Sequence, residues 1–342
     1  MIKRICLRFH MSKIFDNCWA NRIIDVIKNY GELCCVVAGT MGRIAMMDNN
    51  VGNINILKER FVDWINKENF DLVISATHTT SVNRMLADIW HLSKKIKYPI
   101  IGIETNTHTV AYINEEIEDI AKKIANDLKF KLMKGIDFGN NYWIDGNREY
   151  RKVLATEIGD WLLINGIIVG KVKSNDVIIV CENNNIIDIK GVEIKKHGIE
   201  KIGKIDLKNA KIDSISLLRD ESNKRTYIPM VKKEKIAYIE HAGYNIFKFI
   251  EEGICCAVTI GDDTTAIVGD ILERFDIPII GIIDGDKDGL IKGEKLHPNS
   301  IILKVKSDDE FGRRIYEEIF NKRNIIDGNF NWIKERIYEL LS

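Results

Sequence analysis

The sequence has no excess of either charge, since its 342 residues include 50 lysines and arginines and 50 aspartates and glutamates. Proteins dedicated to nucleic acids usually carry a basic excess, so no nucleic-acid partner is expected. No apolar run reaches the length of about 18 residues that a membrane helix needs, and no membrane partner is expected either. Residues 1–6 lead straight into a strand-like run without the layout of a signal peptide, which favours a cytoplasmic protein.

The sequence also lacks the pattern of a disulfide or zinc protein. It has seven cysteines, an odd number, and five of them lie in apolar, strand-like runs: Cys6, Cys34, Cys35, Cys255 and Cys256. Such cysteines are typical of buried free thiols in a reducing compartment. A zinc site needs paired ligands on loops, a geometry that neighbouring cysteines inside a strand do not supply. We expect seven reduced thiols and no zinc, and no flavin or haem either.

What the sequence does have is alternation of short apolar runs with amphipathic segments, over residues 1–140 and again over 233–342. This alternation predicts parallel sheets flanked by helices. In the first module, strands are expected at 5–9, 34–38, 71–75 and 99–103, and helices at 16–29, 58–67, 81–94 and 115–128.

Residues 141–232 differ, because short β-branched runs there are separated by asparagine, glycine and aspartate. They indicate a β-rich insert or linker domain with a hairpin turn at 183–185. The fold class predicted for the whole chain is therefore α/β, with two related Rossmann-like modules and a small β-rich segment between them.

The relation between the two modules is suggested by an internal repeat. The pentapeptide Pro-Ile-Ile-Gly-Ile occurs at 99–103 and again at 278–282. In both places a valine precedes a threonine by seven positions, Val73 to Thr80 and Val258 to Thr265. Chance similarity between βαβ units is the alternative explanation. Duplication predicts that residues 71–103 and 256–282 form similar units with parallel strands.

The densest group of polar residues follows two predicted strands of the C-terminal module, at 257–260 and 279–283. The first strand leads through Gly261 into a helix that Thr264 and Thr265 can cap. Gly261 and both threonines are candidates for phosphate binding, because a helix N-terminus offers free backbone N–H groups to anions. Carboxylates at the same sheet edge are candidate Mg²⁺ ligands: Asp262, Asp263, Asp284, Asp286 and Asp288. Asp284 and Asp286 are also the candidate catalytic residues.

Two other interpretations of these residues are possible from the sequence. Ordinary capped turns use the same residue types. Residues 284–291 also fit the first eight places of a calcium-binding EF-hand loop, but Lys295 stands at the twelfth place and a strand precedes the loop, which argues against an EF-hand.

A second candidate anion site follows the predicted strand at 34–38. Gly39, Thr40 and Gly42 would allow close backbone approach, and Arg43 would clamp a phosphate or carboxylate. A simple turn with a surface arginine is the alternative. Histidines that follow predicted strands are candidates for lining a cleft at the same sheet edge: His10, His78 and His241.

Two resemblances add to these observations. The run from the first strand through Ala-Gly-Thr-Met-Gly-Arg at 38–43 and Met-Asp-Asn at 47–49 resembles an uncharacterised protein family of methanogens and related euryarchaea. Residues 260–265, with 281–286, are similar to phosphate and metal segments of pyrophosphate-dependent phosphofructokinases and NAD kinases. That second resemblance implies Asp262 and Asp263 at a phosphoryl group with magnesium, and Asp284 or Asp286 near an acceptor.

Taken together, the sequence favours a protein that binds a phosphorylated metabolite or nucleotide with Mg²⁺ and carries out phosphoryl transfer. The alternative is a non-catalytic protein that binds a nucleotide or other ligand for sensing or assembly. The sequence leaves open whether the chain is an enzyme, whether it forms a homo-oligomer, and whether the two modules share one cleft.

Overall fold

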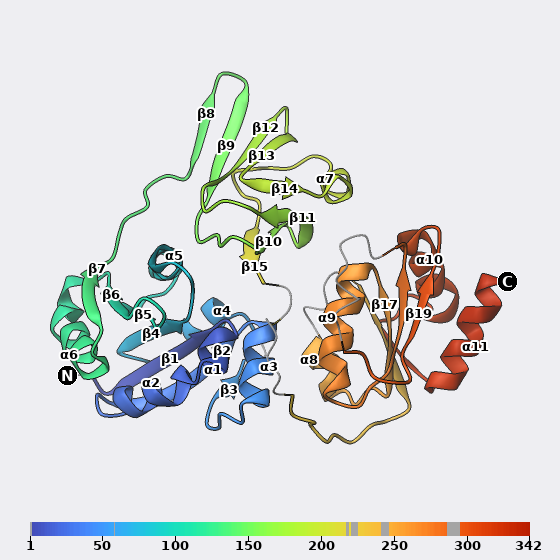
Figure 1. Ribbon diagram of the computed structural model, residues 1–342, viewed down its shortest axis with the longest axis horizontal. Coiled ribbons are helices and arrows are strands. Elements are labelled where there is room, and N and C mark those ends of the chain that lie inside the picture. The colour runs from blue at the N-terminus through green and yellow to red at the C-terminus, as the bar shows by residue number, and fades with distance from the viewer. Residues whose placement is uncertain (1, 58, 217–218, 220–224, 241–245, 286–294) are drawn as a thin grey trace. The chain divides into compact units, whose positions relative to one another are not determined.

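The computed structural model describes residues 2–57, 59–216, 219, 225–240, 246–285 and 295–342. The chain divides into two compact units, Met1–Lys224 and Arg225–Ser342 (Figure 1). Each unit has a mainly parallel sheet with interleaved helices, so the predicted α/β class is confirmed. The strands of the β-rich segment belong to the first unit by their contacts.

The first unit is built on a seven-stranded sheet of order β3-β2-β1-β4-β5-β6-β7. Its strands are β1 (Arg4–His10), β2 (Glu32–Ala38), β3 (Asn55–Ile56), β4 (Leu72–Thr77), β5 (Ile100–Glu104), β6 (Thr109–Tyr112) and β7 (Lys131–Lys134). The first five are parallel, and four of them, β1, β2, β4 and β5, were predicted. Strands β3, β6 and β7 were not predicted, and the expectation of a parallel sheet fails at β6, which runs antiparallel to β5. The buried carboxylate of Glu104 organises the turn between them by accepting N–H bonds from Asn106 and Thr107.

Helices cover both faces of this sheet because its central strands are apolar on both sides. In β1, Ile5, Leu7 and Phe9 enter one core cluster, whereas Cys6 enters the other. The helices are α1 (Lys13–Asp16), α2 (Trp19–Ile27), α3 (Thr40–Asp48), α4 (Phe61–Ile65), α5 (Val82–Ser93), the 3₁₀ turn η1 (Glu115–Ile117) and α6 (Glu118–Leu128). Residues 40–48 were expected to be a turn and loop, but they form α3, with Gly39 at its N-cap.

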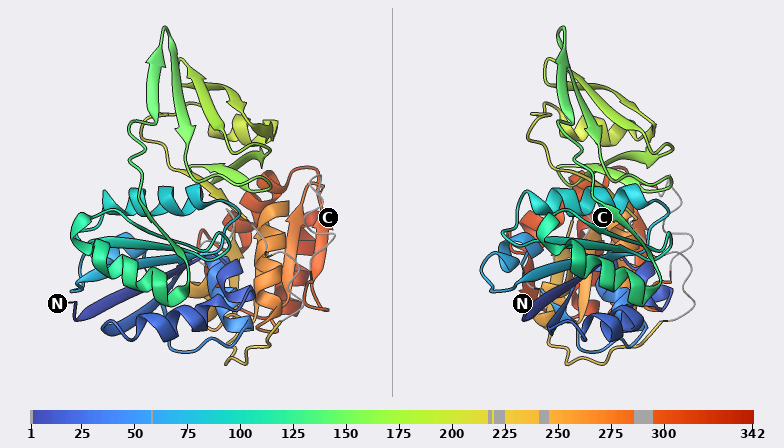
Figure 2. Two further views of the ribbon diagram at one scale, coloured as in Figure 1. Left: turned by 60° about the vertical axis from the view of Figure 1, so that its left-hand side comes forward. Right: turned by 90° about the vertical axis from the view of Figure 1, so that its left-hand side faces the viewer.

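The β-rich segment has two four-stranded antiparallel sheets, ordered β14-β11-β10-β15 and β13-β12-β9-β8 (Figure 2). The strands are β8 (Tyr142–Asp145), β9 (Arg148–Val153), β10 (Trp161–Ile164), β11 (Ile167–Val172), β12 (Val177–Glu182), β13 (Asn185–Lys190), β14 (Val192–Ile194) and β15 (Ile212–Ile215), with helix α7 (Lys196–Ile202). The predicted asparagine hairpin is confirmed, because Asn183 and Asn184 have φ angles of 51° and 64° between β12 and β13.

The second unit has a five-stranded sheet of order β19-β18-β17-β16-β20. Its strands are β16 (Lys235–Ile239), β17 (Cys256–Ile260), β18 (Ile279–Ile283), β19 (Ile301–Lys304) and β20 (Ile325–Asp327). The first four are parallel, and β20, which the sequence analysis missed, is antiparallel to β16. The helices are α8 (Ile246–Glu251), α9 (Asp262–Glu273), α10 (Asp308–Arg314), the π-helical turn η3 (Ile315–Ile319) and α11 (Phe330–Leu341).

The two copies of the repeated pentapeptide occupy similar places in the two units. Both form a strand that pairs in parallel with the strand before it, β5 with β4 and β18 with β17. The glycine of each copy lets the connecting helix approach the sheet: a Cβ at Gly102 would lie 2.2 Å from Met85 Sδ of α5, and one at Gly281 would lie 2.4 Å from Thr265 Cγ2 of α9. The registers differ by one residue, however. Val73 pairs with Ile100, the second residue of its pentapeptide, whereas its counterpart Val258 pairs with Ile280, the third residue of the other copy. Duplication therefore stays a prediction.

Candidate functional site

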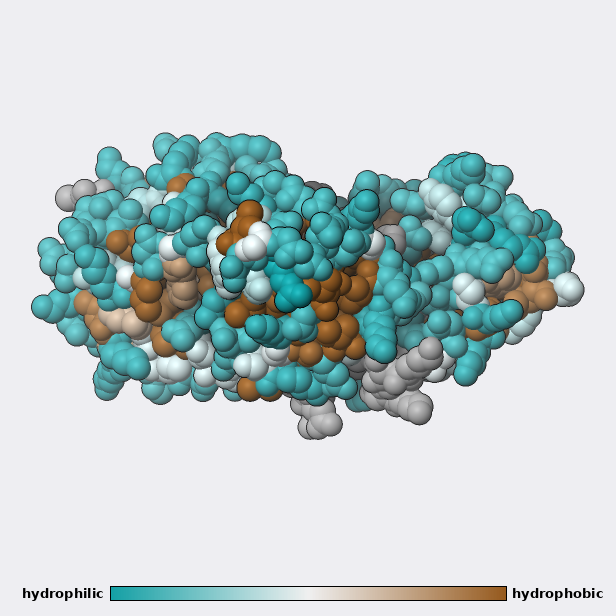
Figure 3. All heavy atoms as spheres, turned by 90° about the horizontal axis from the view of Figure 1, so that it is seen from above, coloured by the Kyte–Doolittle hydropathy of each residue, from teal (hydrophilic) through white to brown (hydrophobic). Residues whose placement is uncertain are grey.

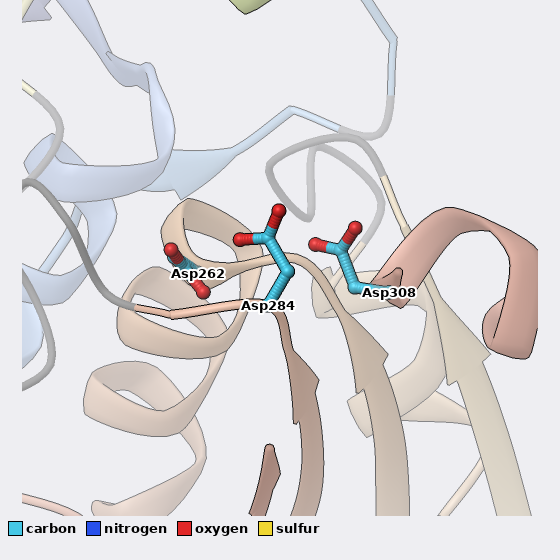
Figure 4. Close-up of side chains that lie close together, drawn as sticks. All are labelled: Asp262, Asp284 and Asp308. Carbon is cyan, nitrogen blue, oxygen red and sulfur yellow. The ribbon is translucent and has the colours of Figure 1, made fainter. Parts of the chain in front are cut away.

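Three aspartates converge at one edge of the sheet in the second unit. One carboxylate oxygen from each of Asp262, Asp284 and Asp308 lies within 4.8 Å of the other two (Figure 4). We call these residues the aspartate triad. Asp262 opens α9 after β17, Asp284 follows β18, and Asp308 opens α10 after β19. Because these strands are parallel and adjacent, their carboxyl ends lie side by side, at the edge where open α/β sheets bind ligands.

The turn from β17 into α9 gives Asp262 its position. Gly261 is the N-cap and has a φ of +95°, which glycine adopts without the steric cost of a Cβ. A Cβ at this position would lie 3.7 Å from Asp308 Oδ2, so the backbone itself borders the triad. The expectation that Thr264 and Thr265 cap this helix was wrong, since both lie inside its first turn.

The sequence-predicted residues of this turn separate into two groups. Asp262 joins the triad, whereas Asp263 does not belong to it. Thr264 is nearly buried, and its Oγ1 would be 3.9 Å from a Cβ at Gly261. Thr265 is fully buried, and its hydroxyl bonds that of Thr259 at 2.9 Å, inside the sheet–helix interface and away from a ligand at the edge.

In the acidic loop, only Asp284 of the three predicted aspartates can be placed. Its carboxylate is partly exposed. Asp286 and Asp288 lie outside the described residues, and so does His241.

Asp308 is the site residue that the sequence analysis missed. It is 8% exposed, and its Oδ1 accepts the N–H of Asp309 at 2.7 Å. The N-cap Ser307 accepts the N–H of Glu310 at 3.3 Å and so fixes the start of α10. A signal was present in the sequence, because residues 307–310 read Ser-Asp-Asp-Glu shortly after the apolar run at 301–305, which is the pattern of a helix capping box.

The chemistry of the triad is that of a hard-cation site. Carboxylate oxygens are the ligands that Mg²⁺ and Ca²⁺ prefer in proteins. Asp262 and Asp308 stand at the first residues of α9 and α10, where the helix dipole stabilises negative charge. The helix dipole accounts for the positions of Asp262 and Asp308, so no bound ligand is needed to explain these two carboxylates. The third, Asp284, is on no helix.

The N-terminal candidate residues gather at the corresponding edge of the first unit. His10 pairs in register with Ala38, the residue before Gly39, and β4 lies on the other side of β1. Strand order reverses at β1, which makes this edge a topological switch point, and His78 follows β4 there.

The side chains at this edge have structural partners. Arg43 donates from Nη2 to the carbonyl oxygen of Leu57 at 2.6 Å, and Gly42 is buried in α3 beside Thr40. His78 Nδ1 lies 2.8 Å from Thr105 Oγ1. Burial lowers the pKa of His10 and of His78, so both rings are neutral at pH 7.

All seven cysteines are free in the structure, as predicted, but the predicted burial is wrong for Cys34 and Cys255. Cys6, Cys35, Cys181 and Cys256 are buried, Cys34 and Cys255 are partly exposed, and Cys18 is exposed.

No helix of the described chain combines the length and apolar character needed to cross a membrane. Hydrophilic residues cover most of the face drawn in Figure 3, with hydrophobic ones between them.

Comparison with known proteins bears out the archaeal resemblance over nearly the whole chain. A family model described as "Uncharacterized protein conserved in archaea (DUF2117)" matches residues 7–323. The uncharacterized protein MJ0065 of Methanocaldococcus jannaschii is 35% identical over 357 aligned positions, which cover 99% of this chain and 94% of that protein. No solved structure matches. The chain therefore belongs to this family of proteins conserved in archaea.

Proposed function

We propose that the aspartate triad binds Mg²⁺ and that, with the metal, the second unit binds a phosphorylated small molecule or nucleotide and carries out phosphoryl transfer. The observation that supports this proposal is the convergence of Asp262, Asp284 and Asp308 from three adjacent strand ends. A single carboxylate at each turn has a structural explanation as a helix cap. The meeting of three carboxylates places like charges together, which costs free energy unless a cation offsets it.

The spacing of the triad fits a divalent cation. Oxygens on opposite sides of Mg²⁺ lie about 4.2 Å apart, and those on opposite sides of Ca²⁺ about 4.6–5.2 Å apart. The three oxygens lie within 4.8 Å of one another, so small side-chain rotations bring them into the Mg²⁺ shell. Three protein ligands leave coordination positions for water and for phosphate oxygens, as is usual for Mg²⁺.

The N-terminus of α9 provides the second part of the proposed site. This helix has 12 residues, and the backbone N–H groups of its first turn point toward the edge that holds the triad. In the proposed site, Gly261 lets a phosphate approach the backbone, and the helix end stabilises its charge. Bound Mg²⁺ would neutralise the charge that develops on the phosphoryl oxygens.

The metal part of the proposal is tested by calorimetric titration of Mg²⁺, and of Ca²⁺ in parallel, into matched variants. Asp308→Asn has a control in its neighbour, Asp309→Asn, and Asp262→Asn has a control in Asp263→Asn. Loss of a residue that only orients a metal ligand commonly weakens binding 10- to 100-fold, so loss of a ligand itself should weaken it at least about tenfold. The two controls should bind the metal like the wild type. Equal affinity in all four variants would refute the metal site.

The phosphate part needs a separate measurement. Melting temperatures with nucleotides, pyrophosphate and sugar phosphates, with and without Mg²⁺, would reveal a ligand, because one present at 100 times its Kd adds about 2.7 kcal/mol of apparent stability. An enzyme should turn its ligand over, with turnover lost in Asp284→Asn. Binding without turnover would instead favour a non-catalytic ligand-binding protein.

A further inference from the structure

A cavity of about 570 Å³ lies inside the first unit, well away in the sequence from the triad. One wall comes from the parallel-sheet module, with residues of β1, α4 and α5, and the other from β9 and residues 209–213 of the β-rich segment. Buried ion pairs join the parallel-sheet module to the β-rich segment: Arg84 of α5 contacts Asp160 at 2.6 Å and Glu157 at 2.9 Å. The cavity therefore lies within a connected part of the fold.

The lining of the cavity is strongly basic. Six cationic side chains face two carboxylates, those of Asp88 and Asp213. The cations are Arg8, Arg60, Lys95, Arg151, Lys152 and Lys211. Four of the six have a carboxylate partner: Arg8 pairs with Asp88, Arg60 with Asp63, Lys152 with Asp176 and Lys211 with Asp213.

The other two cations, Lys95 and Arg151, form no ion pair with any residue that the structure describes. Nη1 of Arg151 donates only to backbone carbonyl oxygens, at 2.7–3.1 Å. The cavity wall thus carries two positive charges that its own carboxylates do not balance.

Arg8 is the buried one of the six cations, with 6% of its surface exposed. Its Nη1 donates to Ser75 Oγ and to Asp88 Oδ2, both at 2.6 Å, and its guanidinium lies 5.3 Å from the centre of the Phe61 ring. An arginine carries five N–H donors. Within the described chain, Arg8 donates only from Nη1, and its buried Nε has no hydrogen-bond partner. The buried Nε is closed to a ligand, so an acceptor from outside the chain would bind the Nη2 N–H groups, for which the described chain provides no acceptor.

Apolar side chains complete the lining beside these cations. Phe61 and Leu92 belong to one wall, and Val153, Leu154 and Ile212 to the other. Apolar side chains beside convergent charges can hold the two parts of a charged organic molecule, and the volume lies in the usual range for small organic ligands. An inorganic ion would fill only a small part of it.

We propose that this cavity binds a small organic phosphate, whose charged group is held by Arg8, Lys95 and Arg151 and whose organic part packs on the apolar walls. A phosphate has the charge to balance both uncompensated cations and the oxygens to accept the free donors of a guanidinium. The site requires no metal. It is independent of the function proposed for the second unit, and its ligand would hold the β-rich segment against α5.

The test is calorimetric titration of the full chain in chelator with two probes, adenosine monophosphate and inorganic pyrophosphate. Lys95→Gln removes an exposed cation of the cavity. Its matched control is Lys94→Gln, because Lys94 is the preceding residue, is also exposed, and does not line the cavity. Adenosine monophosphate should bind the wild type, and more tightly than pyrophosphate, because only its organic part can pack on the apolar walls. Lys95→Gln should weaken that binding roughly tenfold, the usual effect of losing one charge-assisted hydrogen bond.

The controls distinguish this site from the one proposed in the second unit. Lys94→Gln and Asp284→Asn should both bind the probe like the wild type, because neither residue lines the cavity. Failure of adenosine monophosphate to bind in chelator would overturn the proposal, and so would tighter binding of pyrophosphate or equal affinities of Lys95→Gln and Lys94→Gln. Loss of binding in Asp284→Asn would assign the probe to the aspartate triad and overturn it as well.

Discussion

Replacing Asp284 by asparagine should stabilise the second unit when metal is absent. Two unit charges 4.8 Å apart repel each other by about 0.9 kcal/mol in water and by about 3.5 kcal/mol at an effective dielectric constant of 20. Asp284 takes part in two such pairs. The lower value applies to its pair with Asp262, since both are partly exposed, and is a minimum for its pair with the buried Asp308. Salt screening and the lost attraction to nearby helix ends reduce the sum of about 2 kcal/mol to a net gain of about 1 kcal/mol.

Asparagine has nearly the same shape as aspartate, so the substitution at Asp284 removes the negative charge with little change in packing. Among the described residues, the Asp284 carboxylate takes part in no hydrogen bond or ion pair that the change would remove. In chelator, the melting temperature of the second unit should rise by roughly 4 °C, since a unit of this size gains a few degrees for each kcal/mol.

In Mg²⁺, the wild type should become more stable than Asp284→Asn. At 100 times its Kd the metal would add about 2.7 kcal/mol to the wild type. Asp284→Asn lacks one ligand and should gain little, so it becomes the less stable protein. Scanning calorimetry of both proteins in chelator and in Mg²⁺ checks this crossing, with Asp309→Asn as the exposed control. If Asp284→Asn melts below the wild type in chelator and gains as much from Mg²⁺, the repulsion and the metal site are both refuted.

Three other outcomes are expected. Gly281→Ala should destabilise the second unit by about 1–3 kcal/mol in chemical denaturation, because its Cβ would lie 2.4 Å from a Thr265 atom. Gly52→Ala is the control, because open space surrounds Gly52, and equal effects of the two substitutions would contradict the packing argument. In the native protein, a thiol reagent should label Cys18 fastest and the buried cysteines slowest, because burial excludes the reagent and raises the pKa of the thiols. Rapid labelling of Cys35 would contradict this order. Acid should destabilise the first unit below about pH 6.5, since the pKa of His10 is lower in the folded than in the unfolded chain. Between pH 7 and pH 5, the melting temperature of His10→Gln should fall less steeply than that of the wild type. Equal slopes in the two proteins would exclude this contribution of His10.

Much of the local structure could be predicted from the sequence because it depends on neighbouring residues. The apolar runs at 5–9, 71–75, 257–260 and 279–283 form buried strands close to the predicted bounds. The asparagines of the 183–185 hairpin adopt the positive φ angles that such a turn requires. The error at 40–48 has a local cause too: glycines in Gly-Thr-Met-Gly-Arg favoured a turn, but the first is an N-cap and the second lies in α3, whose apolar side the core buries.

The candidate site depended on contacts that no local pattern contains. Asp262 and Asp308 are far apart in the sequence, and they meet only because β17, β18 and β19 are consecutive neighbours in the sheet. The sequence alone showed acidic residues after β17 and β18, since strand ends and helix caps are local features, but it did not single out Asp308 after β19. Which carboxylates meet, and that Thr265 is buried against Thr259 instead of facing a ligand, was decided by strand order and helix packing, because these set the distances between residues remote in the chain.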